Sequence, residues 1–192
     1  MTDRSLDFYG PFSFGFGPNY LFTSEFAKKE GVYLWVIKDT KNDLNYIEYV
    51  GETYNFAKRQ KEHLVAIIGL SYRIINANSA RMGELKIVWN GLWRDKSSEG
   101  VGKLLEIFPE VSKYILDYVS LIDIYFAPTS FETYLRKHVE GCIGWNLRNK
   151  YSQYKTFYPD DNHIGTMPTK LNEVLTITSQ EPILGLDREL LI

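Results

Sequence analysis

Two apolar, aromatic-rich segments separated by a short polar one constrain the fold of this chain more than any other feature. Residues 31–38 read GVYLWVIK and residues 46–51 read YIEYVG, with the polar residues 39–45 between them. β-Branched and aromatic side chains favour strands, and a polar connection of this length favours a hairpin. The two segments are therefore predicted to pair, with Tyr33 and Tyr49 at the same end of the hairpin.

The rest of the chain predicts helices and one further strand. Residues 55–68 place apolar side chains on one helical face, with Thr53 or Asn55 as the N-cap. Residues 121–127 indicate a strand, and a helix is expected from about residue 131 to residue 139 or beyond. This order predicts an α+β fold with a small, mainly antiparallel, three-stranded sheet that is flanked by helices.

The remaining segments are predicted to be additions to a single domain, because 192 residues suit one well-packed unit. Glycine, proline and aromatic residues over 8–20 indicate an ordered but irregular lead-in. The longest addition holds a possible strand at 84–89 and a helical stretch that Pro109 interrupts. We expect five parts in chain order: an N-terminal extension (1–30), the first half of the core (31–69), an insertion (70–120), the second half of the core (121–150) and a C-terminal extension (151–192).

The cysteine count and the hydropathy pattern indicate the compartment. Cys142 is the only cysteine, so the chain has neither a disulfide framework nor a zinc finger. No stretch approaches 18 uninterrupted apolar residues, and residues 1–7 lack the apolar region of a secretory signal. We therefore expect an intracellular, cytoplasmic protein without a membrane partner.

Two tripeptides in the predicted hairpin resemble the signature of a known enzyme family. GVY at 31–33 and YVG at 49–51 are similar to the paired tripeptides of the GIY-YIG nucleases, with valine in place of isoleucine. The run from Gly51 to Arg59, with His63 four residues later, is similar to the segment that follows the second tripeptide in that family. The resemblance covers about seventy residues, and the fifteen residues between Tyr33 and Tyr49 make a longer hairpin connection than is common in the family.

The resemblance implies a role for each matched residue. Tyr33, with its pKa lowered by a metal-bound water and nearby cations, would take the proton from the attacking water, and Tyr49 would orient the site. Arg59 would offer a forked donor to two phosphate oxygens. His63, on the same helical face as Arg59, would hydrogen-bond the water or assist the base. Asn146 would bind phosphate or hold a neighbouring group.

A single carboxylate is implied as the protein ligand of one Mg²⁺ or Mn²⁺ ion, which would keep several waters and bind a substrate phosphate. Glu132 fits the family pattern because Asn146 follows it after fourteen residues. Glu140 is the competing candidate, although it lies only six residues before Asn146. The structural alternatives stay open: core aromatic residues for the two tyrosines, an exposed basic face for Arg59 and its neighbours, and a favourable helix-start carboxylate for Glu132.

The charge distribution bears on the implied partner, which is DNA. A net charge of −2 is unusual for a nucleic-acid binder, but the charges are segregated. Residues 131–158 carry five basic and two acidic side chains, whereas residues 159–192 carry two basic and six acidic ones. We expect DNA recognition from the insertion, with Arg73, Arg81, Lys86, Arg94, Lys96 and Lys103 as the candidate residues.

The sequence thus predicts a Mg²⁺-dependent endonuclease that hydrolyses DNA. One set of motifs implies one strand cut per encounter, so we expect monomers in free solution that pair on DNA if both strands are cut. The alternative is a catalytically silent DNA-binding or structural module that retains the same fold.

Overall fold

The computed structural model describes residues 4–15, 17–92, 98–151 and 173–192, and these form an α+β fold. The main sheet has six strands in the order β3-β2-β6-β1-β7-β8, and it curls into a half-barrel. A second sheet pairs β4 with β5. The strands are β1 (Arg4–Phe12), β2 (Gly31–Asp39), β3 (Leu44–Thr53), β4 (Ile74–Ile75), β5 (Ile87–Trp89), β6 (Ile122–Pro128), β7 (Val174–Ser179) and β8 (Glu189–Leu191).

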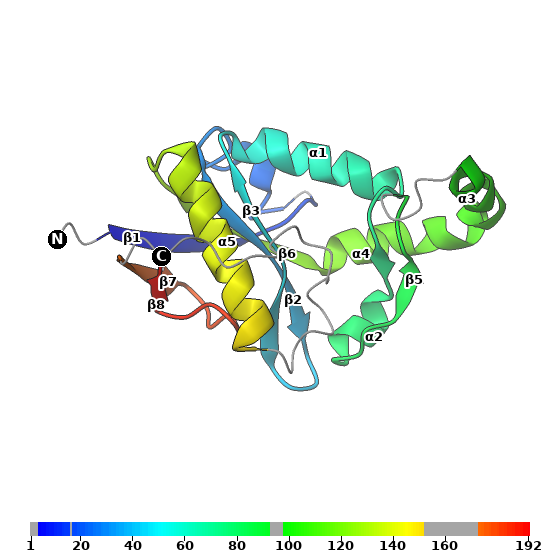
Figure 1. The fold of residues 1–192 in the computed structure, drawn as a ribbon. Helices are drawn as coiled ribbons and strands as arrows, with labels where there is room; N and C mark the ends of the chain where they lie inside the picture. Colours follow the sequence, from blue (N-terminus) through cyan, green and yellow to red (C-terminus); the bar gives the residue numbers. More distant parts are fainter. Residues whose placement is uncertain (1–3, 16, 93–97, 152–172) are drawn as a thin grey trace.

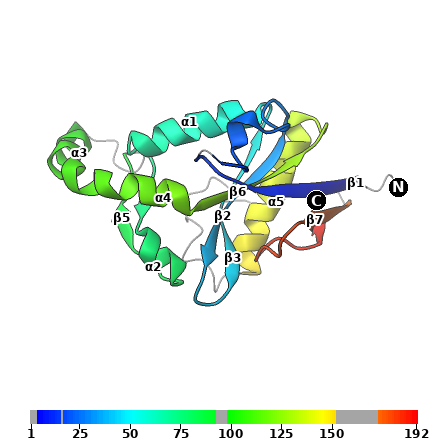
Figure 2. The ribbon, with the colours of Figure 1, turned by 180° about the vertical axis from the view of Figure 1, so that it is seen from behind.

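The helices pack on both faces of the main sheet. Figure 1 shows α5 in front of the sheet, and in Figure 2, which is turned by 180°, strands of the sheet lie in front of α5. The insertion lies on the side of the molecule away from β7 and β8 in both views. No helix in the described part of the chain is long and apolar enough to span a membrane. The helices are α1 (Phe56–Ile68), α2 (Ala77–Arg81), α3 (Ser98–Val111), α4 (Ile115–Leu121) and α5 (Thr133–Asn149), with 3₁₀ turns at Leu21–Thr23 and Ser112–Tyr114.

The sheet is larger than the three strands predicted from the sequence. The antiparallel trio β3-β2-β6 corresponds to the predicted sheet. β1 then pairs with β6 and runs parallel to β7, which pairs with β8. Residues 8–12 of the predicted lead-in belong to strand β1, which places Phe8 in the core, and the irregularity is a register shift against β6 between Tyr9 and Phe12. Sequence separation hid this pairing, since β1 and β7 lie at opposite ends of the chain.

β2 is buried on both faces, and it divides the interior into two cores. Tyr33, Trp35 and Ile37 face the core that α1 and α4 cover. The alternate residues of β2 face a second core, which is covered by α5 and by the strands of the two termini. This double burial explains why residues 31–38 form a continuous apolar run rather than an alternating one.

Candidate active site

The two signature glycines allow backbones and rings to approach closely. A side chain at Gly31 would overlap the carbonyl oxygen of Ala127 on β6. Gly51 lies opposite Tyr33 in the β2–β3 register, and a side chain there would overlap the Tyr33 ring and hydroxyl. The Tyr33 side chain therefore extends across β3, which is the edge strand of the sheet. The hydroxyl reaches α1 by this route.

Helix α1 supplies Arg59 and His63 to the site. Asn55, one of the two predicted N-cap residues, caps α1: its side chain accepts a hydrogen bond from the Lys58 backbone nitrogen. Gln60 and His63 are buried on the inner face, and Arg59 lies at its margin with 40% of its side chain exposed. Arg59 also pairs with Glu62 at 3.2 Å.

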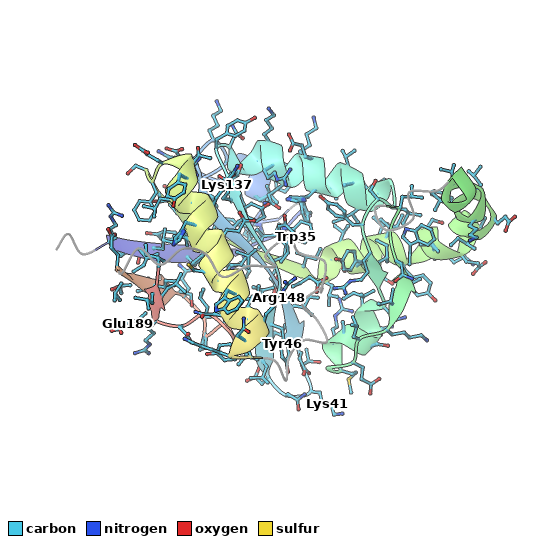
Figure 3. The ribbon with its side chains drawn as sticks, viewed as in Figure 1. Trp35, Lys41, Tyr46, Lys137, Arg148 and Glu189 are labelled. Carbon is cyan, nitrogen blue, oxygen red and sulfur yellow. The ribbon has the colours of Figure 1, made fainter. Side chains whose placement is uncertain are left out.

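His63 belongs to a cluster of five aromatic rings. The His63 ring centroid lies 4.9 Å from that of Trp35 and 5.4 Å from that of Tyr49. Trp35 is held in turn by its indole nitrogen, which donates to Gln60 Oε1 at 2.9 Å. Figure 3 shows Trp35 on the side of the sheet toward the insertion. The members of the cluster are Tyr33, Trp35, Tyr49, His63 and Tyr72.

His63 makes a hydrogen bond through each ring nitrogen. Its Nε2 lies 2.6 Å from the Tyr33 hydroxyl, and its Nδ1 lies 2.9 Å from the Tyr72 hydroxyl. Burial, and secondarily the Arg59 charge, lowers the pKa of His63 to about 3. The imidazole is therefore neutral at physiological pH, with one nitrogen donating and the other accepting.

Burial also raises the pKa of the two signature tyrosines, Tyr33 and Tyr49. It raises the pKa of Tyr33 well above the ordinary value, Tyr49 adds to this increase, and the Arg59 guanidinium partly offsets it. Burial and the Glu140 charge raise the pKa of Tyr49, again against the influence of Arg59. The chain alone thus keeps Tyr33 protonated, in contrast to the lowered pKa that the family resemblance implies. Tyr33 has no exposed surface, whereas Tyr49 is half-buried.

The carboxylate that the structure brings to this group is Glu140. Burial and the nearby Glu52 charge raise the pKa of Glu140 to about 7, while Arg59 and Lys137 act in the opposite direction. The Glu140 charge also raises the pKa of both tyrosines. Lys137 projects from the part of α5 that lies toward α1 in Figure 3. Glu140 therefore shares one electrostatic environment with Tyr33, Tyr49 and Arg59.

Glu132 and Asn146 lie elsewhere on α5. Glu132 is the exposed residue before the first turn, and its side chain makes no capping hydrogen bond. Eight residues of helix separate it from Glu140, about 12 Å along the axis. Asn146 follows Glu140 by six residues, so it points about 120° away around the helix. The structure does not bring Glu132 or Asn146 to the group that contains Glu140.

Arg136 fixes α5 against the sheet and neutralises the second carboxylate of this region. Its side chain is only 2% exposed, and its guanidinium contacts Glu52 at 3.2 Å and Glu30 at 2.6 Å. It also donates to the Phe131 carbonyl and to the Thr133 hydroxyl. Arg136 is one of the five basic residues counted between 131 and 158, and its burial removes it from any DNA-binding face.

A β-bulge joins the insertion to the site. Trp35 pairs with Tyr49 and Val36 pairs with Ile47, so Glu48 is an extra residue in β3. Glu48 is buried and accepts from Arg73 at 2.8 Å, and it also hydrogen-bonds Tyr118. Arg73 is thus engaged inside the protein, which argues against its predicted role in DNA recognition. Of the other five candidate residues of the insertion, Lys86 and Lys103 are exposed, Arg81 is half-buried, and Arg94 and Lys96 lie outside the described residues.

The donor groups near Glu140 fit a hard divalent cation. Glu52 already has Arg136 as its partner, whereas burial and the Glu52 charge raise the pKa of Glu140, and a cation at Glu140 would stabilise its charged form. No group of three or more acidic, histidine or cysteine side chains suited to a metal occurs among the described residues. Mg²⁺ commonly uses one or two carboxylates and completes its shell with water and phosphate. The residues present therefore suit Mg²⁺ rather than a metal that needs a closed protein cage.

No protein-family model, curated protein or solved structure matches this chain.

Proposed function

We propose that this chain is a divalent-metal-dependent endonuclease that hydrolyses DNA, with the active-site chemistry of the GIY-YIG nucleases that its motifs resemble. The observation that carries the proposal is the convergence of Tyr33, Arg59 and Glu140 from β2, α1 and α5. A phenol, a guanidinium and a carboxylate in one environment supply proton transfer, phosphate binding and metal binding, which are the functions that phosphodiester hydrolysis needs. The resemblance of the two tripeptides is the second support.

Arg59 binds the scissile phosphate in this mechanism. Its guanidinium is partly exposed and its charge acts on both Tyr33 and Tyr49, so a phosphate that pairs with it would lie close to the two tyrosines. A planar guanidinium can donate to two phosphate oxygens at once. This contact draws Arg59 outward and admits a water to Tyr33, which is fully buried before substrate binds.

Tyr33 removes the proton from that water. The water oxygen then forms a bond to phosphorus as the bond from phosphorus to the leaving oxygen breaks. Glu140, rather than Glu132, would hold the metal in this proposal, with Glu52 close by. The metal, when bound, supplies positive charge that stabilises the phosphate and the leaving oxyanion.

A single active site can cut one DNA strand at a time. We therefore propose that the enzyme is a monomer in free solution and nicks DNA, and that any double-strand break requires a second copy or a second encounter. A plasmid time course with light scattering tests this. Nicked circles should accumulate before linear product, whereas a monomer on DNA that gives linear product without nicked circles would contradict it.

The nuclease proposal is tested with supercoiled plasmid, linear DNA, single-stranded DNA and RNA, each with Mg²⁺, Mn²⁺ or EDTA. We expect Mg²⁺-dependent cleavage of DNA that EDTA abolishes. Tyr33→Phe should lower turnover by about a hundredfold and leave DNA binding intact. Tyr54→Phe is the matched control, because the Tyr54 hydroxyl is exposed and contacts only Lys58 among the described residues. Binding to DNA without cleavage under every condition would favour the silent module instead.

A further inference from the structure

A continuous chain of hydrogen bonds leads from the buried end of the site to the insertion. It runs from the Tyr33 hydroxyl to His63 Nε2 at 2.6 Å, and from His63 Nδ1 to the Tyr72 hydroxyl at 2.9 Å. Tyr33 and His63 have no exposed surface, whereas Tyr72 is only half-buried. Tyr72 is therefore the member of this chain that can exchange a proton with solvent.

The proposed function leaves a proton without a destination. Tyr33 is a phenol at neutral pH, because burial raises its pKa, so it cannot keep the proton of the water as well as its own. His63 does not hold an extra proton either, because burial keeps the imidazole neutral. A stable charge on either residue is disfavoured. A transfer in which each residue gains one proton and loses another avoids such a charge.

We propose that Tyr72 completes a proton relay, Tyr33–His63–Tyr72, that carries the proton of the attacking water out of the site. This proposal rests on the nuclease function proposed above. The water proton moves to the Tyr33 oxygen as the Tyr33 hydroxyl proton moves to His63 Nε2. The Nδ1 proton of His63 moves to the Tyr72 oxygen, and the Tyr72 hydroxyl proton passes to solvent. Each residue ends neutral, and the electron pair of the water oxygen forms the bond to phosphorus.

This relay assigns a tautomer to His63 before reaction. Nδ1 carries the proton and donates to Tyr72, while Nε2 accepts from Tyr33. Tyr72 is thus a positioning residue, because it fixes which nitrogen faces Tyr33 with a lone pair. The insertion holds it there: the next residue, Arg73, is tied to Glu48 of the β-bulge at 2.8 Å.

Tyr72→Phe tests the relay, with Tyr114→Phe as the matched control. Tyr114 is also a half-buried tyrosine of the insertion, and it packs against the same core. In ¹⁵N-histidine spectra, with the His63 signals identified by their loss in His63→Gln, we expect a proton on Nδ1 in the wild type. Tyr72→Phe should move it to Nε2, since the Tyr33 oxygen is then the remaining partner, and Tyr114→Phe should leave it on Nδ1. A wild-type proton on Nε2, or a tautomer that does not respond to Tyr72→Phe, would overturn the relay.

Single-turnover cleavage with Mg²⁺ supplies the second readout. Tyr72→Phe should slow cleavage by roughly tenfold or more at unchanged DNA affinity. The rate in mixtures of H₂O and D₂O should depend on several protons in the wild type and in Tyr114→Phe, and on fewer in Tyr72→Phe. If the wild type cleaves and its proton dependence matches that of Tyr72→Phe, the relay is wrong and the nuclease function stands. If the wild type cuts no nucleic acid while His63 keeps the expected tautomer, the nuclease function is wrong and the relay falls with it.

Discussion

The ring of Tyr33 lies across Gly51, so that the Tyr33 hydroxyl ends where a side chain at residue 51 would begin. The two residues are opposite each other in the β2–β3 register. Gly51, the last residue of the second tripeptide, therefore leaves the space that the ring of Tyr33 in the first tripeptide occupies. This relationship gives the spacing of the two motifs a physical reason, because only glycine leaves room for the ring to cross the edge strand.

Gly51→Ala should displace Tyr33 and break its bond to His63. The added methyl group overlaps a buried ring with no free space around it, and overpacking of this kind typically destabilises by about 1–3 kcal/mol. Urea unfolding measures the loss. Gly102→Ala is the control, since nothing lies within 4 Å of a side chain at that helical position, and it should be neutral or slightly stabilising. Equal stabilities for the two variants would show that Tyr33 does not occupy the space over Gly51.

His63 should make the protein sensitive to mild acid. Its folded-state pKa of about 3 lies below the ordinary 6.5, so the stability that it contributes is complete above pH 6.5 and is lost as the pH falls toward 3. The free energy of unfolding should fall by up to about 1.4 kcal/mol per pH unit on account of this one group. Unfolding curves from pH 7.5 to 4.5 for the wild type and His63→Gln measure the difference in slope. Parallel slopes would mean that folding does not lower the pKa of His63.

The strands and α1 were predictable because their signals are local. Residues 31–38 and 46–51 pair as expected, and Asn55 caps α1 as one of the two proposed residues. The contribution of the termini to the sheet was not predictable, because β1 pairs with a strand at the other end of the chain; Arg4 and Glu173, which bond beside this pairing, are 169 positions apart. Both segments alternate polar and apolar residues as half-buried strands do, but nothing in either segment identifies the other as its partner.

The candidate site shows the same division. Tyr33, Tyr49, Arg59 and His63 come together because a hairpin and the helix directly after it fix their positions. The carboxylate on α5 depends instead on where that helix crosses the sheet, which is set by tertiary contacts such as those of Arg136. The spacing to Asn146 in the family pattern favoured Glu132 as the metal ligand, whereas the position at which α5 crosses the sheet favours Glu140. Trp35 could have been found by its spacing of two from Tyr33, but no sequence signal marked the insertion residue Tyr72.

Arg59→Lys should impair cleavage although it keeps the positive charge. Lysine loses the planar fork that can hold two phosphate oxygens at once. Cleavage under saturating DNA should fall by on the order of a hundredfold. Lys61→Met on the exposed face of α1 is the comparison for a simple loss of charge, and it should weaken binding more than turnover. Wild-type turnover in Arg59→Lys would remove Arg59 from the phosphate.

The central claim is that Glu140 completes a metal-dependent site with Tyr33 and Arg59. The paired variants Glu140→Gln and Glu132→Gln test it, because both lie on or beside α5 and differ in their relation to the site. Glu140→Gln removes a half-buried charge whose pKa is raised to about 7, so its melting temperature at pH 8 should be unchanged or higher. A loss of activity in this variant therefore cannot be attributed to unfolding.

The deciding measurement is the rate of Mg²⁺-dependent plasmid nicking by the two variants at pH 8. We expect Glu140→Gln to lose roughly a hundredfold or more, since a metal ligand supports several kcal/mol of transition-state stabilisation. Glu132→Gln should nick at the wild-type rate. Wild-type nicking by Glu140→Gln, with loss of nicking in Glu132→Gln, would contradict the account.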